Sequence, residues 1–195
     1  MKDKKIQEYL KNADRFSDAG ELYQGISNQD KGTRDLNDRW KLYRITSKDL
    51  KDAVVVDIGC NIGGFSFFCK DDCKSYLGID TYKKSIELAR HLFPFSNCTF
   101  EVGKFRDLYG RFDVILALAV RRYTGFSFEE FAKECHSLLN KNGLMFFESH
   151  GREKWTPTVR QAFEKYFDIQ RMIYVPSTSH SDCENVRFFI RGKKK

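Results

Sequence analysis

The residues best suited to chemistry form a loop between two acidic side chains. Residues 54–68 read VVVDIGCNIGGFSFF, in which three valines lead to Asp57 and then to a turn with Gly59 and Gly63. A second acid, Asp80, ends the later run KSYLGID. A glycine-rich turn between a strand and a helix brings backbone N–H groups close to a ligand, and an acid ending the next strand can accept hydrogen bonds from ribose hydroxyls. These residues therefore predict a nucleoside-binding loop.

Asp57 and Asn61 discriminate between nucleoside cofactors. A dinucleotide-binding loop usually has a second glycine where this chain has Asn61. A carboxylate at Asp57 would repel a pyrophosphate, whereas it favours a ligand with a sulfonium and an ammonium group. The loop is therefore predicted to prefer a cationic nucleoside to a nicotinamide dinucleotide.

The elements that must position these residues alternate as in an α/β protein. Apolar runs predict strands, and amphipathic or capped segments predict the helices between them. The expected strands are 53–59, 74–80, 98–103, 111–120, 144–150, 167–175 and 185–192, and the expected helices are 63–71, 81–93, 127–143 and 156–167. The fold class that follows is a Rossmann-like, doubly wound, mostly parallel seven-stranded sheet that closes with a C-terminal antiparallel hairpin.

The runs VVVDIGCNIGG and YLGID together resemble the first two motifs of class I S-adenosylmethionine-dependent methyltransferases. The resemblance extends from about Asp52 to the C-terminus. It implies S-adenosyl-L-methionine as cofactor, with Asp80 at the ribose. The residues that it places against the cofactor are Asp57, Gly59, Cys60, Asn61, Gly63, Asp80, Thr81 and Leu118.

Recognition of the adenine is less clear, because members of this family often carry an acid just after the third strand. Here that stretch reads EVGKFRDL, with Lys104 and Phe105 at the position in question. Either a backbone amide binds the adenine while Phe105 packs on its ring, or Asp107 reaches back to it.

The acceptor should face the ends of the fourth and fifth strands, where the chain reads LALAVRRYTG and FFESHGREKW. A general base is needed only when the acceptor must lose a proton. His150 is the first candidate, with Glu148 or Tyr123 as alternatives. His150 and Glu148 could equally well bond to loop backbone.

Arg121 and Arg122 suggest an anionic acceptor, because two guanidinium groups at the lip of a site can grip a phosphate or carboxylate. Alternatively, the two arginines are ordinary loop residues with solvated charges. The formal charge is +7, but residues 191–195, RGKKK, supply four of these charges. That run is expected to be either a frayed tail or a phosphate contact.

The predicted function is methyl transfer to an anionic small-molecule or glycan acceptor, which could be phosphorylated. RNA as the acceptor, or a nucleic-acid-binding protein with an inactive methyltransferase-like fold, are the alternatives. A nicotinamide-dependent oxidoreductase is disfavoured by Asp57 and by the terminal hairpin. The oligomeric state stays open.

Two segments are expected: a helical lid at 1–50 and the cofactor-binding domain at 51–195. The N-terminal residues that could touch the cofactor carboxylate or the acceptor, if they do not simply pack, are Tyr23, Gln24, Arg34 and Arg39. No run is long enough for a membrane span, and the charged start is unlike a secretory signal. The six cysteines are expected to be free thiols without a zinc site, so a cytoplasmic location is predicted.

Overall fold

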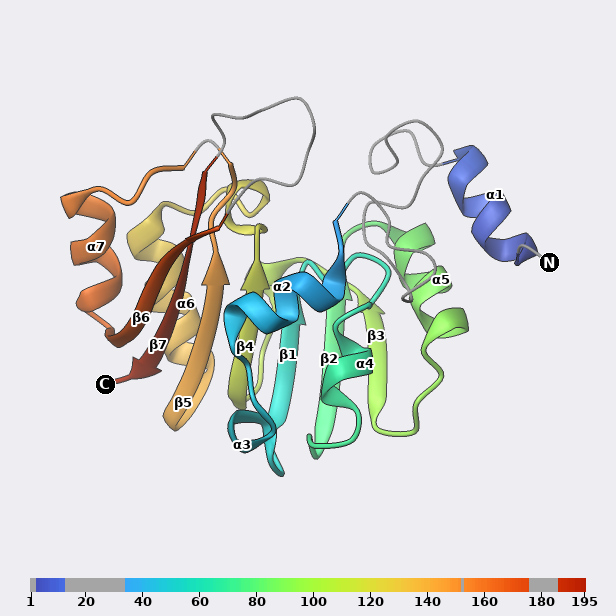
Figure 1. Cartoon of the computed structure of the whole chain (residues 1–195), viewed down its shortest axis with the longest axis horizontal. Coiled ribbons are helices and arrows are strands. Elements are labelled where there is room, and N and C mark those ends of the chain that lie inside the picture. Colours follow the sequence, from blue (N-terminus) through green and yellow to red (C-terminus); the bar gives the residue numbers. More distant parts are fainter. Residues whose placement is uncertain (1–2, 13–33, 152, 176–185) are drawn as a thin grey trace.

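The computed structural model describes residues 3–12, 34–151, 153–175 and 186–195. Its centre is one seven-stranded sheet with the strand order β3-β2-β1-β4-β5-β7-β6 (Figure 1). The strands are β1 (Val54–Ile58), β2 (Ser75–Asp80), β3 (Cys98–Val102), β4 (Phe112–Leu118), β5 (Leu139–Glu148), β6 (Phe167–Val175) and β7 (Arg187–Lys194).

The first five strands pair in parallel, and β7 is antiparallel to both of its neighbours, β5 and β6. Strand order reverses at β1, which lies between β2 and β4. Such a reversal opens a crevice beyond the carboxyl ends of the strands, where ligands of doubly wound sheets bind. The predicted fold class is confirmed.

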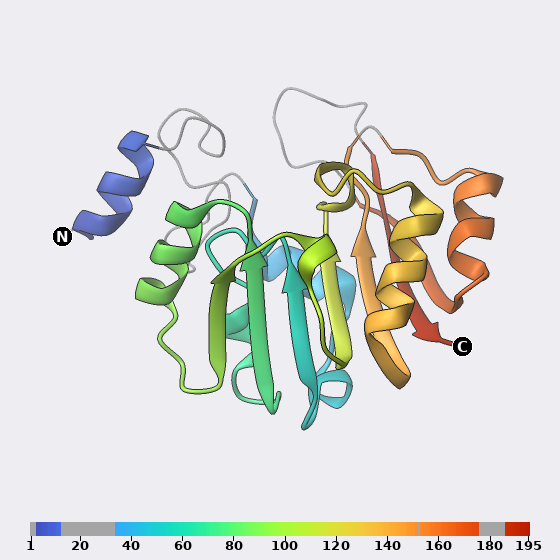
Figure 2. The same cartoon turned by 180° about the vertical axis from the view of Figure 1, so that it is seen from behind.

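Helices cover both faces of this sheet (Figures 1 and 2). They are α1 (Lys4–Asn12), α2 (Leu36–Tyr43), α3 (Ser47–Leu50), α4 (Ser66–Cys69), α5 (Lys83–Leu92), α6 (Phe128–Leu138) and α7 (Pro157–Glu164), with short 3-10 helices η1 (Phe105–Asp107) and η2 (Arg121–Tyr123). Because successive strand side chains point to opposite faces, Val55 enters one hydrophobic core and Val56 the other.

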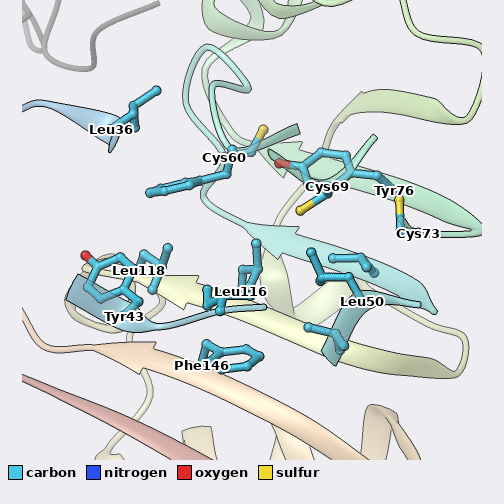
Figure 3. Packing of buried hydrophobic residues seen from close by; sticks show 14 of the residues in the cluster. Leu36, Tyr43, Leu50, Cys60, Cys69, Cys73, Tyr76, Leu116, Leu118 and Phe146 are labelled. Atoms are coloured by element: carbon cyan, nitrogen blue, oxygen red, sulfur yellow. The ribbon is translucent and has the colours of Figure 1, made fainter. Parts of the chain in front are cut away.

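The first core contains buried residues of α2, α3, α4 and α5 together with alternate strand residues (Figure 3). Tyr43 of α2 is fully buried there and stacks on Phe189 of β7, with ring centroids 4.5 Å apart. Trp40 stacks on Phe68 at 4.9 Å. Helix α2 thus packs on one face of the sheet, while α1 packs on α5 and the division of the chain at residue 50 stays a prediction.

The helix predicted for 127–143 is shorter in the structure. Its start is as expected, because Ser127 and Glu130 form a capping box. However, α6 ends at Leu138, since Leu139 already pairs with Phe112 in the sheet. Gly143 lies within β5, where an added Cβ would come 3.1 Å from the carbonyl oxygen of Asp113. This glycine allows close strand packing instead of ending a helix.

The basic run at the C-terminus is not a frayed tail. Arg191, Lys193 and Lys194 belong to β7. The guanidinium group of Arg191 lies 2.6 Å from the Asp49 carboxylate, and Lys194 Nζ donates to the carbonyl oxygen of Leu139 at 2.7 Å. Strand pairing on both sides of β7 orders residues that a charge pattern alone assigns to solvent.

Among the described residues, five cysteines are free thiols, and no group of histidine, cysteine or acidic side chains could hold a metal ion. Cys183 lies outside the described residues, as do Tyr23 and Gln24. Within the same described parts, no helix is long and apolar enough to cross a bilayer.

Candidate cofactor and acceptor site

The site lies where the parallel strands end. Asp80 is the last residue of β2, Asp57 the last but one of β1, and Glu148 the last of β5. Because β7 runs in the opposite direction, its first residue, Arg187, reaches the same edge. Parallel pairing therefore brings together side chains that are far apart in the sequence.

The loop after β1 has a backbone that only certain residues tolerate. Gly59 has a φ of +71°, and a Cβ there would come 2.4 Å from Val120 Cγ2. Asn61 also has a positive φ, of 54°, and its Oδ1 accepts a hydrogen bond from the backbone N–H of Ile62 at 2.7 Å. Asparagine tolerates this conformation better than most residues, so the side chain of Asn61 stabilises the turn itself.

Gly63 is required for a similar reason. Its φ is +78°, and a Cβ would come 2.4 Å from Phe100 Cε1 of β3. The loop is also tied to β2, since the N–H groups of Gly59 and Cys60 both donate to the carbonyl oxygen of Ile79, at 2.8 and 3.0 Å. The loop is thereby held close against the ends of β1 and β2.

Asp80 accepts hydrogen bonds that fix its carboxylate beside this loop. The donors are the N–H of Asn61 and the N–H of Tyr82, each at 2.9 Å and each to a different oxygen. Burial raises the pKa of Asp80, and the hydrogen bonds from Tyr82 and Asn61 act in the opposite direction. A carboxylate has about four acceptor positions. Asp80 can therefore still accept hydrogen bonds from ribose hydroxyls.

Asp57 lies deeper than the sequence suggests, with only 2% of its surface exposed. The hydroxyl of Tyr76 donates to Asp57 Oδ2 at 2.6 Å. Burial raises the pKa of Asp57 to about 7, although the Tyr76 hydrogen bond and the charge of Arg39 lower it. A cation bound at the loop would favour the ionised form of this carboxyl group.

The other predicted cofactor residues differ in their exposure. Cys60 and Leu118 are buried, so Cys60 meets a ligand at the loop only through its backbone, and Thr81 is exposed. The ring of Phe105 is buried against Phe126 and Phe131, with centroids 5.5 and 4.9 Å apart. Packing of Phe105 on adenine therefore competes with these core contacts. Asp107, the alternative, is exposed.

Glu148 is the centre of a buried ionic group, which we call the arginine cluster: Glu148, Arg34, Arg39 and Arg187. Arg34 donates to both carboxylate oxygens, at 2.7 and 3.4 Å, and Arg39 Nη2 donates to Oε2 at 3.0 Å. Arg187 Nη1 lies 3.7 Å from the same oxygen. Arg39 also donates from Nε to the Tyr43 hydroxyl at 2.9 Å.

This environment is unsuited to a general base. Burial alone would raise the pKa of Glu148, but the positive charges of Arg34, Arg39 and Arg187 outweigh it and hold the pKa at about 2. A carboxylate that stays ionised among guanidinium groups accepts protons poorly. Of the three predicted base candidates, His150 and Tyr123 lie on the loops after β5 and β4, and a role as general base stays a prediction for both.

Arg121 is not a free lip residue. Its guanidinium group forms an ion pair with Glu153, donates to the carbonyl oxygen of Phe126 at 2.5 Å, and lies 4.2 Å from the ring centroid of Phe128. These contacts fasten the loop after β4 to the loop after β5. The neighbouring Arg122 is exposed, and its contact with the acceptor stays a prediction.

Tyr123 and His150 meet across the same two loops. The Tyr123 hydroxyl lies 3.3 Å from His150 Nε2, and their rings are arranged edge to face. Tyr123 is 68% exposed. The backbone N–H of His150 donates to Glu153 at 2.7 Å, so the partner of Arg121 also positions the His150 loop.

Comparison with known proteins agrees with this geometry. A family model described as a methyltransferase domain matches residues 49–187. The chain belongs to this methyltransferase family. The family predicted from the loop and from Asp80 is thereby confirmed.

Two curated relatives of this methyltransferase-family chain are 30% identical to it. The alignment with the tRNA U34 carboxymethyltransferase of Campylobacter fetus subsp. fetus (strain 82-40) covers 72% of this chain and 52% of the relative. The alignment with the ubiquinone biosynthesis O-methyltransferase of Pelagibacter ubique (strain HTCC1062) covers 67% of this chain and 62% of the relative. The chain thus spans about half to three fifths of the relatives it matches.

Solved structures of methyltransferases share the fold. N-methyltransferase NodS of Bradyrhizobium japonicum WM9, in complex with S-adenosyl-L-homocysteine, is 16% identical with a TM-score of 0.67, over 81% of this chain and 86% of that one. Magnesium protoporphyrin IX methyltransferase of Synechocystis PCC 6803, with bound S-adenosylmethionine, is 17% identical with a TM-score of 0.62, over 81% and 77%.

The feature that sequence reasoning missed in this methyltransferase-family chain is the arginine cluster. Glu148 and Arg34 are 114 positions apart, so no local spacing relates them. The sequence predicts separate ligand contacts or simple packing for Arg34 and Arg39, and no role for Arg187. The one available signal was an acid ending an otherwise apolar strand, because such an acid requires a cationic partner when it is buried.

Proposed function

We propose that this protein transfers the methyl group of S-adenosyl-L-methionine to an anionic small-molecule or glycan acceptor. The observation that carries the proposal is the loop from Gly59 to Gly63, held against the ends of β1 and β2 by N–H donors to Ile79 and Asp80. Cofactor complexes of two proteins with the same fold support the choice of cofactor.

The residues at the loop suit the chemical groups of this cofactor. Asp80 would hold the ribose through its remaining acceptor positions. Asp57 supplies a negative charge below the loop, and Arg39 lies close enough to lower the pKa of Asp57. We infer that Arg39 meets the carboxylate at the amino-acid end of the cofactor, a role that the sequence left open beside contact with the acceptor and simple packing.

When bound, S-adenosylmethionine supplies an electrophilic methyl group on its sulfonium. Its transfer is an in-line displacement, so the protein has mainly to align the acceptor and exclude water. Tyr123 and His150 lie on the loops after β4 and β5, on the acceptor side of the strand reversal. His150 would accept the proton of an acceptor hydroxyl at Nε2, in place of its 3.3 Å contact with the Tyr123 hydroxyl.

The acceptor class rests on charge. Arg122 is exposed beside Tyr123, and the arginine cluster carries more positive than negative charge. One relative is named for a tRNA substrate and the other for ubiquinone biosynthesis. RNA is therefore the second acceptor class to be tested.

Calorimetric titration tests the cofactor. S-adenosylhomocysteine should bind and NAD should not. The double variant Asp57→Ala, Asp80→Ala should bind S-adenosylhomocysteine at least tenfold more weakly than the wild type. The control is Asp71→Ala, which removes an exposed carboxylate. An unchanged affinity of the double variant for S-adenosylhomocysteine would contradict the proposed cofactor site.

Labelled S-adenosylmethionine tests the acceptor. Cell extract should be separated into RNA, glycan and small-molecule fractions before incubation with the protein. Label in the glycan or small-molecule fraction is expected, and label that only nuclease releases would replace this acceptor class with RNA.

A further inference from the structure

We propose that the arginine cluster is an anion receptor that binds a carboxylate or phosphate group of the methyl acceptor. This inference rests on the proposed function, because it gives the acceptor a binding point beside the cofactor loop. The residues that carry it are Arg34, Arg39, Arg187 and Glu148.

The cluster is buried with an excess of positive charge. Its exposed fractions are 4% for Arg34, 3% for Arg39, 9% for Arg187 and 0% for Glu148. Three guanidinium groups and one carboxylate leave a net charge of +2. Burying uncompensated charge is strongly unfavourable, so such a cluster is expected to bind an anion.

Neither Asp57 nor the cofactor removes this excess. Asp57 acts on Arg39, and its pKa of about 7 means that its negative charge is only partly present at neutral pH. Bound S-adenosylmethionine would add one carboxylate, but also an ammonium and a sulfonium group. Counted over the described residues alone, the positive charges of the cluster therefore still outnumber the negative ones.

Hydrogen-bond donors in the cluster also lack acceptors. Among the described residues, Arg39 Nη1 and both Nε and Nη1 of Arg187 are buried without a hydrogen-bond partner. Arg187 Nη1 is 3.7 Å from the Glu148 carboxylate, which is beyond hydrogen-bond distance. A guanidinium group with two unused donors can take a carboxylate or phosphate by two parallel hydrogen bonds.

The position of Arg187 assigns this anion to the acceptor rather than to the cofactor. From β1, which carries Asp57, the sheet continues through β4 and β5 to β7. Three strand spacings of about 4.8 Å place the start of β7 roughly 14 Å from the end of β1. Arg39 is close enough to Asp57 for its charge to lower the pKa of that carboxyl group. Arg39 is thus closer to the cofactor loop, and Arg187 lies on the acceptor side.

Thermal unfolding of the protein saturated with S-adenosylhomocysteine tests the proposal, with inorganic phosphate or acetate replacing chloride at constant ionic strength. Each anion should raise the melting temperature of the wild type. Arg187→Gln should lose this increase, with phosphate affinity reduced at least tenfold. Arg191→Gln is the matched control, because Arg191 lies in the same strand and also pairs with a carboxylate.

Two results would overturn the proposal. One is an equal anion effect in Arg187→Gln and the wild type. The other is an effect that exists without S-adenosylhomocysteine and disappears once it is bound, because the cluster would then bind the cofactor's own carboxylate. If S-adenosylhomocysteine does not bind at all, the proposed function fails, and the phosphate titration of the free protein still reports on the receptor.

If Arg187→Gln does not fold, the variant Glu148→Gln provides a second test of the anion receptor. This variant removes the internal carboxylate and raises the excess positive charge. The increase in melting temperature with phosphate should therefore be larger than in the wild type. An equal or smaller increase would contradict an anion receptor at this position.

Discussion

Replacing Asp57 with asparagine is expected to make the free protein more stable at pH 8 and to leave its stability nearly unchanged at pH 4. The reason is the buried position of Asp57, which raises its pKa from 3.8 to about 7. Asparagine has almost the same shape, and its Oδ1 can still accept the hydrogen bond from Tyr76. The substitution therefore removes mainly the ionisable group.

The expected magnitude follows from the pKa difference. Well below pH 3.8, Asp57 is protonated in both the folded and the unfolded chain and does not affect the free energy of unfolding, and at pH 4 its effect is still small. As the pH rises to about 7, the unfolded chain loses this proton while the folded chain keeps it, and the free energy of unfolding falls. A raised pKa of this size, at about 1.4 kcal/mol per unit, lowers the stability by about 4 kcal/mol above pH 7. The asparagine variant should recover a similar amount.

Urea unfolding of the wild type and of Asp57→Asn, repeated from pH 4 to pH 8, measures this effect. The exposed Asp71, replaced with asparagine, provides the baseline for the chemical change itself. Parallel pH profiles for the wild type and Asp57→Asn, or a less stable Asp57→Asn at pH 8, would refute the reasoning.

The same variant connects Asp57 to the cofactor. S-adenosylmethionine carries a sulfonium charge that S-adenosylhomocysteine lacks. At pH 8, Asp57→Asn should therefore weaken binding of S-adenosylmethionine about tenfold more, which is the effect of one unit charge at roughly 10 Å and an effective dielectric constant of about 20. Equal losses for both ligands in calorimetry would show that the charge of Asp57 does not act on the sulfonium.

Three further predictions concern the loop, the base and the acceptor lip. Gly59→Ala should weaken S-adenosylhomocysteine binding at least tenfold, as measured by calorimetry. Adding Val120→Ala should restore only part of this affinity, because it removes the 2.4 Å clash between the new Cβ and Val120 Cγ2 but not the positive φ at residue 59. Full affinity in Gly59→Ala would show that the loop adapts. His150→Ala should lower kcat about 10²–10⁴-fold without changing S-adenosylhomocysteine affinity, whereas an unchanged kcat would exclude it as the base. Arg121→Met should lower the free energy of unfolding in urea by about 2 kcal/mol, because the mostly buried Glu153 carboxylate loses its ion-pair partner. Arg122→Met, at an exposed residue, should change this free energy by less than about 0.5 kcal/mol. Equal effects of the two substitutions would contradict the structural role of Arg121.

Much of the fold was predictable because its determinants are local. The valines before Asp57 predict β1, the capping box of Ser127 and Glu130 predicts the start of α6, and Thr156 with Pro157 predicts the start of α7. Each of these patterns acts within one or two turns of chain or along one strand. The predicted end of α6 was wrong, because Leu139 pairs with Phe112 of β4. Pairing between distant strands cannot be recognised from the residues next to Leu139 in the sequence.

By itself, the sequence predicted which residues meet at the proposed cofactor loop. Asp57 and Asp80 lie at the ends of two neighbouring parallel strands, and Gly59 and Gly63 lie in the loop after the first of them, so parallel pairing brings all four to one edge of the sheet. For such residues, position along the chain and position in space are tied by the strand–loop–helix geometry.

Only the tertiary structure decided the acceptor half. Glu148 was one alternative for a base and is a buried partner of Arg34, Arg39 and Arg187. Arg121 was left open between a ligand contact and an ordinary loop charge, and it pairs with Glu153. The sequence does not distinguish an arginine or glutamate that is solvated from one that forms an ion pair or binds a ligand. Burial and the charges brought next to it by distant segments decide between these states, and both arise only when the sheet is assembled.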